Sequence, residues 1–163
     1  MAGRVRHQLV ASCTRRVPHH SLPYRHPTPD DLPALAALML DAYQGTIDDD
    51  GETLDDALTE VASYFNLESV PPILDCSFIA LDGDRATSAS LIRLWNATPL
   101  AAYVYTGRGW KNRGLAAALL QLSINALARN GYQSLTLWVT AGNAPAEYIY
   151  RKLGFREVTT PGS

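Results

Sequence analysis

The sequence predicts a mixed α/β domain in which helices flank one central sheet. Asp82-Gly83-Asp84 lies between two short apolar runs and is typical of a tight turn that joins two antiparallel strands. A long helical pattern separates two later apolar runs, Leu100–Tyr105 and Leu135–Val139, as in a strand–helix–strand unit. A sheet that contains both kinds of connection is mixed, and the length of 163 residues suits one such domain.

The first half of the chain is expected to contain one short strand, Tyr24–His26, followed by two helices. Thr28-Pro29-Asp30-Asp31 marks the start of the first helix, because a hydroxyl can cap the free N–H groups and proline and carboxylates suit the first turn. We expect this helix to end or bend at Gly45. Thr53-Leu54-Asp55-Asp56 repeats the start signal for the second helix, and Pro71-Pro72 stop helical structure after it.

The second half is expected to alternate strands with two further helices. The long helix follows Gly114 and closes at Asn130-Gly131, which is a common left-handed helix end. The short helix covers Ala144–Leu153 and closes at Gly154. The strands are expected at Cys76–Leu81, Thr87–Leu94, Leu100–Tyr105, Leu135–Val139 and Phe155–Val158.

The composition fits a globular protein and excludes several other classes. The fractions of 47% hydrophobic and 18% charged residues are ordinary, and no apolar run reaches membrane-spanning length. The two cysteines, Cys13 and Cys76, argue against a disulfide scaffold and favour a reducing compartment. We therefore expect a cytoplasmic protein without a membrane partner, in which Cys76 is a buried packing residue.

Residues 1–22 are expected to form a flexible N-terminal extension, with the domain covering residues 23–163. The extension carries Arg, His and Pro, contains no acid, and shows no clean period. Its composition resembles a transit peptide, but Pro18 and Pro23 and the missing amphipathic pattern weaken that interpretation. Chain termini are commonly disordered unless packing holds them.

Charge is divided unevenly along the chain, although the formal net charge is only -2. Residues 1–25 hold five arginines and no acid, whereas residues 26–84 hold 14 of the 16 acids and no Lys or Arg. Such a division suits a protein that holds an anion on one side and a cation on the other, although a solvated acidic surface explains it as well. The acidic middle opposes nucleic-acid binding through the N-terminal arginines.

The glycine-rich segment 107–114 is the most informative part of the chain. Lys111, Arg113 and Gly114 stand at the start of a long apolar helix, where unpaired N–H groups and a partial positive charge favour a bound anion. A P-loop is excluded because Asn112, not Ser or Thr, follows the lysine, and a dinucleotide fingerprint lacks its third glycine and its acidic residue. The segment therefore predicts a pyrophosphate cradle, with a plain strand–helix turn as the alternative.

A second motif follows the strand at 135–139. Asn143 stands where a helix N-cap belongs, and Pro145 suits the first turn. Tyr150 lies seven residues after Asn143, about two turns along the same helix face. One short helix could thus present an amide and a phenol to the same cleft.

These two segments resemble the signature of the GNAT superfamily of acyltransferases. The loop after the family's fourth strand has the pattern Arg/Gln-x-x-Gly-x-Gly/Ala, which is matched by Lys111, Gly114 and Ala116. The segment after the fifth strand carries Asn, Ala and Tyr and then Gly-Phe, matched by Asn143, Ala146, Tyr150 and Gly154-Phe155. The resemblance covers the element order of residues 24–158 and is specific over residues 104–155.

The resemblance implies an N-acetyltransferase that moves an acetyl group from acetyl-CoA to a primary amine, without a metal. It implies a mostly antiparallel sheet whose fourth and fifth strands splay apart to admit the cosubstrate. The pantetheine arm would pair with Val104, Tyr105 and Thr106 and with Asn143, and Tyr150 would protonate the departing thiolate. The pyrophosphate would be held by Lys111, Asn112, Arg113, Gly114, Leu115 and Ala116.

The sequence departs from the family pattern at two places, at Lys111 and after Val158. Lys111 supplies charge without the fork of donors that arginine would offer. The family usually continues into another strand after the position of Val158, so the sheet edge is either short or completed by a partner chain, as in a homodimer. The acidic segment Asp48–Glu52 is expected to attract a cationic amine, small or on a protein, while the general base stays undetermined. A non-catalytic acyl-CoA-binding regulatory module on the same fold is the alternative.

Overall fold

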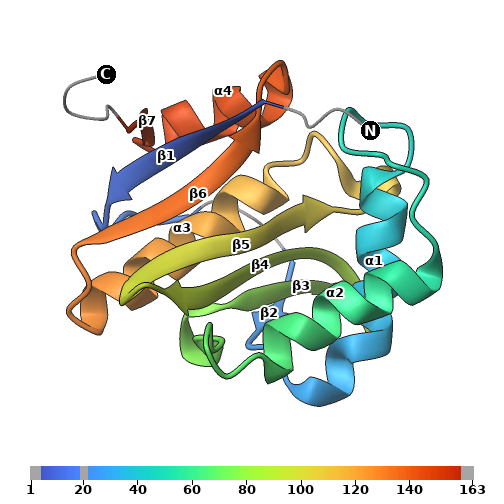
Figure 1. Cartoon of the computed structure of the whole chain (residues 1–163). Helices are drawn as coiled ribbons and strands as arrows, with labels where there is room; N and C mark the ends of the chain where they lie inside the picture. Colours follow the sequence, from blue (N-terminus) through green and yellow to red (C-terminus); the bar gives the residue numbers. More distant parts are fainter. Residues whose placement is uncertain (1–4, 19–21, 159–163) are drawn as a thin grey trace.

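The computed structural model describes residues 5–18 and 22–158, which form one seven-stranded sheet with helices on both faces (Figure 1). The strand order is β2-β3-β4-β5-β6-β1-β7. Every registered strand pair is antiparallel except β5 with β6, so the expected mixed, mostly antiparallel sheet is confirmed. The strands are β1 (Arg6–Ser12), β2 (Tyr24–Arg25), β3 (Phe78–Asp82), β4 (Arg85–Trp95), β5 (Thr98–Thr106), β6 (Ser134–Thr140) and β7 (Arg156–Glu157).

The four α-helices of the described residues divide between the two faces of the sheet. α1 (Leu32–Tyr43) and α2 (Leu54–Asn66) bury one apolar cluster against β3, β4 and β5, with Leu35 and Val61 at 0% exposure. α3 (Leu115–Arg129) and α4 (Ala144–Lys152) pack on the other face, against a cluster that includes β1 and β6. The expected helix starts at Thr53, Gly114 and Asn143 are confirmed, and the Thr53 hydroxyl accepts the N–H of Asp56 at 3.2 Å in a capping box on α2. At Thr28 the expected start is a 3-10 turn, Pro29–Asp31, which leads into α1 at Leu32.

The N-terminal segment forms a strand, so the expectation of a flexible extension is wrong for its described part. β1 pairs with β6 from Arg6 opposite Thr140 to Ser12 opposite Ser134, and β7 pairs with its other edge. Figure 1 shows this blue strand beside the orange β6. Leu9, at 2% exposure, lies in the α3-side core together with Ala11, since alternate residues of a strand face the same side of the sheet. Residues 1–4 and 19–21 of the predicted extension lie outside the described residues.

The pairing of β1 also changes the expectation for the sheet edge. The position beside β6 is occupied by β1 of the same chain, and β7 lies beyond it. Among the described residues, the two-residue β7 (Arg156–Glu157) forms the edge of the sheet on this side, as in the expected alternative of a short edge. Completion of that edge by a partner chain, as in a homodimer, stays a prediction.

β5 and β6 splay apart, as the resemblance implied. In the described residues their parallel register consists of one pair, Leu100 with Thr136, although β5 continues to Thr106 and β6 to Thr140. A register shift between Leu91 and Ile92 of β4, opposite Tyr103 and Ala101 of β5, interrupts the pairing of β4 with β5 where this divergence begins. Such irregularities bend the strand that carries them. The result is an opening between the carboxyl ends of two neighbouring parallel strands.

Cys76 opens the run that leads into β3 and packs in the core. Cys76 is 0% exposed, and burial raises the pKa of its thiol to about 12, so its expected role as a packing residue is confirmed. Within residues 5–18 and 22–158, no helix is long and apolar enough to cross a membrane.

Candidate functional site

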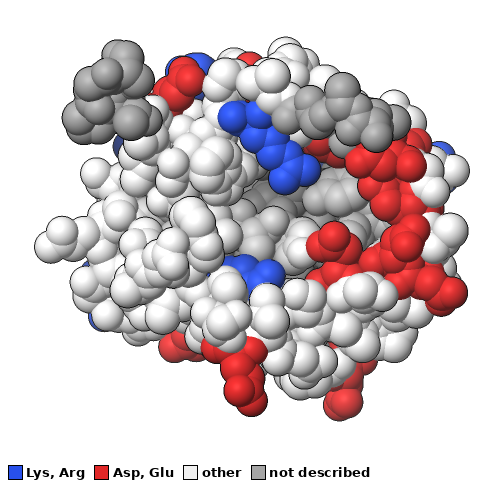
Figure 2. Space-filling view, in the orientation of Figure 1, with Lys and Arg blue, Asp and Glu red and all other residues white. Residues whose placement is uncertain are grey.

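A cleft of about 2260 Å³ opens where β5 and β6 diverge. Figure 2 shows the hollow on the face that carries α1 and α2. Its walls come from the α1–α2 connection, β5, the glycine-rich loop, β6 and α4. Every residue that the sequence analysis assigned to the site lines this cleft except Arg113.

The start of α3 forms one end of the cleft. Gly114 is the N-cap and has φ 77, a left-handed conformation that favours glycine. The first intrahelical bond runs from the Ala118 N–H to the Gly114 carbonyl at 3.0 Å. The N–H groups of Leu115 and Ala116, in the first turn, have no acceptor within the helix. Backbone donors and the helix dipole therefore face the cleft at this point.

The cations of the loop hold the loop in place. The Lys111 ammonium donates to the Ala42 carbonyl near the end of α1 at 2.9 Å. The Arg113 guanidinium stacks over the Trp110 ring, 4.7 Å from its centroid, which explains why it does not line the cleft. Both side chains still place positive charge near the start of α3.

Asp41 fastens the preceding turn to α1. Its carboxylate accepts the backbone N–H and the Nε–H of Arg108, each at 2.9 Å, and these bonds hold its pKa below the ordinary value. Gly107 permits the close approach, since a Cβ there would come within 3.2 Å of Leu38. The loop is thus held against α1 at several points.

At Tyr105 and Thr106, β5 contributes backbone rather than side chains to the opening. Tyr105 is buried, and its hydroxyl donates to the Leu35 carbonyl at 3.1 Å. Burial raises the pKa of this phenol well above its ordinary value. The Thr106 hydroxyl hydrogen-bonds the Ser88 hydroxyl at 2.9 Å. With these side chains committed to the fold, the backbone of residues 104–106 is the part left beside the diverging β6.

α4 presents Asn143 and Tyr150, as expected. The Asn143 side-chain oxygen caps the helix by accepting the Ala146 N–H at 3.3 Å. Tyr150 packs edge-on against Phe155, with ring centroids 5.8 Å apart. Burial, and next the charge of Asp48, raise the pKa of Tyr150 to about 12. This phenol therefore keeps its proton at neutral pH.

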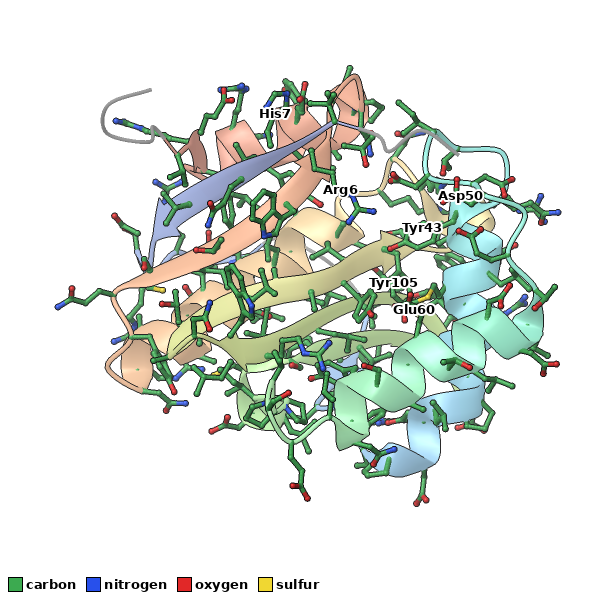
Figure 3. The ribbon with its side chains drawn as sticks, viewed as in Figure 1. Arg6, His7, Tyr43, Asp50, Glu60 and Tyr105 are labelled. Carbon is green, nitrogen blue, oxygen red and sulfur yellow. The ribbon has the colours of Figure 1, made fainter. Side chains whose placement is uncertain are left out.

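Acidic and hydroxyl side chains line the opposite wall. Asp48 accepts the Thr140 hydroxyl at 2.7 Å, and Glu60 on α2 accepts the Tyr103 hydroxyl at 2.5 Å. Burial, and next Glu60, raise the pKa of Tyr103 above its ordinary value. Figure 2 shows the acidic side chains gathered on the right of the hollow, and Figure 3 shows Glu60 and Asp50 on that side.

Sequence reasoning missed Arg6 and Tyr103 as residues of this wall. Arg6 begins β1 and lines the cleft, and Figure 3 shows it on the side of the cleft that faces Tyr43 and Asp50. The sequence marks its strand only by the short run Gln8-Leu9-Val10-Ala11, in which Leu9 and Ala11 are buried in the structure.

Comparison with known proteins finds a family model that matches part of the chain and solved structures with the same fold. Residues 88–161 match the family model "FR47-like protein". A mycothiol acetyltransferase from Corynebacterium jeikeium is 42% identical over 50 residues, which are 31% of this chain and 14% of that protein. The chain thus spans only a small part of this curated relative.

Solved structures agree over nearly the whole chain. A GCN5-related N-acetyltransferase from Sphaerobacter thermophilus has a TM-score of 0.74 at 19% identity, covering 94% of this chain and 48% of that one. The PaiA N-acetyltransferase from Thermoplasma acidophilum, in complex with coenzyme A, has a TM-score of 0.66 at 16% identity, covering 88% and 95%. The expected resemblance to the GNAT superfamily is confirmed: residues 88–161 match the FR47-like family model, and the chain has the fold of these GNAT structures.

Proposed function

We propose that this protein is an N-acetyltransferase that moves an acetyl group from acetyl-CoA directly to a primary amine. The observation that carries the proposal is one cleft with the start of α3 at one end and the protonated phenol of Tyr150 beside it. The match of residues 88–161 to the FR47-like family and the acetyltransferase relative support it.

The residues of the cleft fit acetyl-CoA. The backbone of Val104–Thr106 lies beside the gap between β5 and β6 and can pair with an extended amide-bearing arm. Gly114 and the first-turn N–H groups of α3 can bind a pyrophosphate, with Lys111, Asn112 and Arg113 around them. The Asn143 side chain has an NH₂ group that makes no hydrogen bond within the described residues, so it can donate to the arm. When bound, acetyl-CoA supplies an acetyl group activated as a thioester.

Tyr150 is the general acid in this proposal. Its pKa of about 12 keeps the proton on the phenol until the thiolate leaves. Asp48 contributes by placing negative charge near the hydroxyl, which disfavours the phenolate. A backbone N–H of β5 near Tyr105 polarises the carbonyl under attack.

The acidic wall prepares the acceptor amine. A primary amine is mostly protonated near pH 7 and must lose a proton before it attacks. The segment Asp48–Glu52 and Glu60 attract the ammonium form, and their carboxylates accept its proton directly or through water. No residue of the chain needs to carry the acetyl group.

The first test is a thermal-shift titration with acetyl-CoA beside NADH and ATP, followed by release of free CoA in the presence of amines. A ligand at about 100 times its Kd adds roughly 2.7 kcal/mol to the free energy of unfolding. We expect a shift with acetyl-CoA alone and CoA release that depends on amine.

Each part of the result has a distinct meaning. A larger shift with NADH or ATP would contradict the cofactor assignment at the start of α3. A shift with acetyl-CoA without CoA release for any amine would favour a non-catalytic acyl-CoA-binding module on the same fold.

A further inference from the structure

We propose that the acceptor carries a carboxylate as well as its amine, and that Arg6 binds this carboxylate at the mouth of the cleft. The inference rests on the proposed function and adds the substrate class: a small zwitterionic amine of the amino-acid type. It is carried by the position of β1, which brings an N-terminal arginine to the acceptor wall.

The register of the sheet determines where Arg6 points. Arg6 lies directly opposite Thr140 of β6, and residues opposite each other in an antiparallel pair share a face. Leu9 and Ala11 face the α3-side core, and successive residues of a strand face opposite sides of the sheet. Arg6 and Gln8 therefore face the other side, which places Arg6 with Thr140 on the α1–α2 side. The Thr140 hydroxyl donates to Asp48 at 2.7 Å, which places Arg6 next to the acidic wall. Figure 3 shows the side chain at the opening between β6 and β5.

Arg6 differs from Arg93, Arg108 and Arg113 because its donors are not used by the fold, and it differs from Arg16, whose backbone bonds Asn125 of α3, because it lies beside the acidic wall. Arg93 donates to the Val70 and Ser63 carbonyls, and Arg108 is bound to Asp41. Arg113 stacks on Trp110. Within the described residues, Arg6 makes no hydrogen bond or ion pair, and its side chain is exposed at the cleft. A guanidinium in this state can bind a carboxylate through two parallel N–H donors.

The charges around Arg6 favour a zwitterion over a simple anion. Asp48, Asp50 and Glu60 line the same cleft, so a phosphate dianion would be repelled by more charge than one guanidinium supplies. An ammonium group on the same ligand reverses that repulsion, because it lies toward the carboxylates while its carboxylate lies toward Arg6. Trp138, 45% exposed and on β6, offers an apolar surface for the rest of the ligand.

The test compares free amino acids with their α-carboxamides, which keep the amine and lose the negative charge. In the full-length protein, Arg6→Gln should raise KM for the carboxylates by roughly tenfold and leave KM for the carboxamides unchanged. Taking the ratio between variant and wild type cancels the difference in amine basicity. The Kd for acetyl-CoA should not change. Arg6→Lys should raise KM for the carboxylates less than Arg6→Gln does, because it keeps the charge.

Arg85→Gln is the matched control, since Arg85 begins β4 at an exposed position next to the β3–β4 turn and away from the cleft. Equal KM changes for carboxylates and carboxamides in Arg6→Gln would overturn the inference. If CoA binds and no amine is acetylated, the proposed function fails. The Arg6 site is then judged by thermal shift of the CoA-loaded protein with the same ligand pairs. Stabilisation by carboxylates that Arg6→Gln abolishes would uphold the site, and no difference between the pairs would refute it.

Discussion

The two walls of the cleft are built in different ways. The cofactor wall runs through one continuous stretch, from β5 through the glycine-rich loop into α3, and it offers mainly backbone groups. The acceptor wall is assembled from side chains on β1, the α1–α2 connection, α2, β5 and β6. Arg6, Asp48, Glu60 and Tyr103 are its principal polar groups.

This difference implies that the two ligands are recognised independently. Backbone donors at a helix start depend little on which side chains surround them, so Lys111 can replace the arginine or glutamine of the family pattern. Charged side chains of the acceptor wall can change without altering the path of that backbone. Variants of each wall should therefore affect one ligand and spare the other, and the predictions below test that separation.

The largest expected effect concerns Tyr150, which lies where the two walls meet. Tyr150→Phe removes the proximal proton donor and keeps the ring packed on Phe155. We expect kcat to fall by about 10²- to 10⁴-fold, the range for loss of a positioned acid, while the Kd for acetyl-CoA is unchanged. Steady-state kinetics and a binding titration give the two quantities.

Tyr148→Phe is the matched control, because Tyr148 lies on the same helix at 69% exposure. It should leave kcat within a factor of two or so, as surface substitutions usually have small effects. An unchanged kcat in Tyr150→Phe would instead mean that another group protonates the thiolate.

The next effect tests whether β1 is fixed well enough to present Arg6. Leu9→Ala removes a side chain that is 2% exposed in the α3-side core. The expected loss in free energy of unfolding is about 2–5 kcal/mol, measured by chemical denaturation. Val17→Ala, at an 80% exposed position outside the strand, should change it little. A neutral Leu9→Ala would indicate that the segment does not pack on the sheet, and Arg6 would lose its fixed place.

Local signals predicted most of the fold and missed one strand. The hairpin at Gly83, the capped start of α2 at Thr53 and the left-handed end of α3 at Gly131 all depend on neighbouring residues, and all three are confirmed. β1 could not be predicted in the same way, because its partner β6 lies at the other end of the chain. Two buried residues, Leu9 and Ala11, are a weak pattern beside the Arg- and Pro-bearing segment that surrounds them.

The residues of the site likewise fall into those that local motifs predict and those that only long-range contacts place. Gly114, Asn143 and Tyr150 were accessible to sequence reasoning because each belongs to a short motif with fixed spacing. The contact of Lys111 with the Ala42 carbonyl depends on where α1 ends in space, and no spacing encodes it. Arg6 enters the cleft only through the register of β1 with β6. Long-range pairing, rather than residue type, is what the sequence left undetermined.

A smaller effect is expected at the start of α3. Gly114→Ala places a Cβ on a left-handed residue, which costs about 1–2 kcal/mol of stability, and it crowds the approach to the first-turn N–H groups. Gly131→Ala introduces the same conformational cost at φ 87 at the other end of the helix. Both variants should lose similar stability, but only Gly114→Ala should weaken acetyl-CoA binding, by roughly tenfold for about 1.4 kcal/mol. Equal Kd values in the two variants would contradict the cradle.

The smallest effect is a change in pH dependence that links the walls. Burial is the larger cause of the raised pKa of Tyr150, about 12, and the charge of Asp48 is the second. Asp48→Asn keeps an oxygen for the Thr140 hydroxyl and removes the charge, so the pKa of Tyr150 should fall part of the way toward its ordinary value. A general acid acts only while protonated, and the fall in kcat at alkaline pH should therefore begin at a lower pH in the variant.

Phenolate absorbance during a pH titration measures this pKa directly when the signal of Tyr150→Phe is subtracted. Folding is favoured less as pH rises from about 10 toward 12, because the unfolded phenol ionises first, so the titration must be checked for unfolding. Asp50→Asn is the control, since Asp50 lies in the same acidic segment and is not a cause of the Tyr150 shift. If both asparagine variants move the titration equally, the effect belongs to the field of the whole segment. A shift confined to Asp48→Asn would mean that the acceptor wall, through one carboxylate, keeps the proton that the departing thiolate requires.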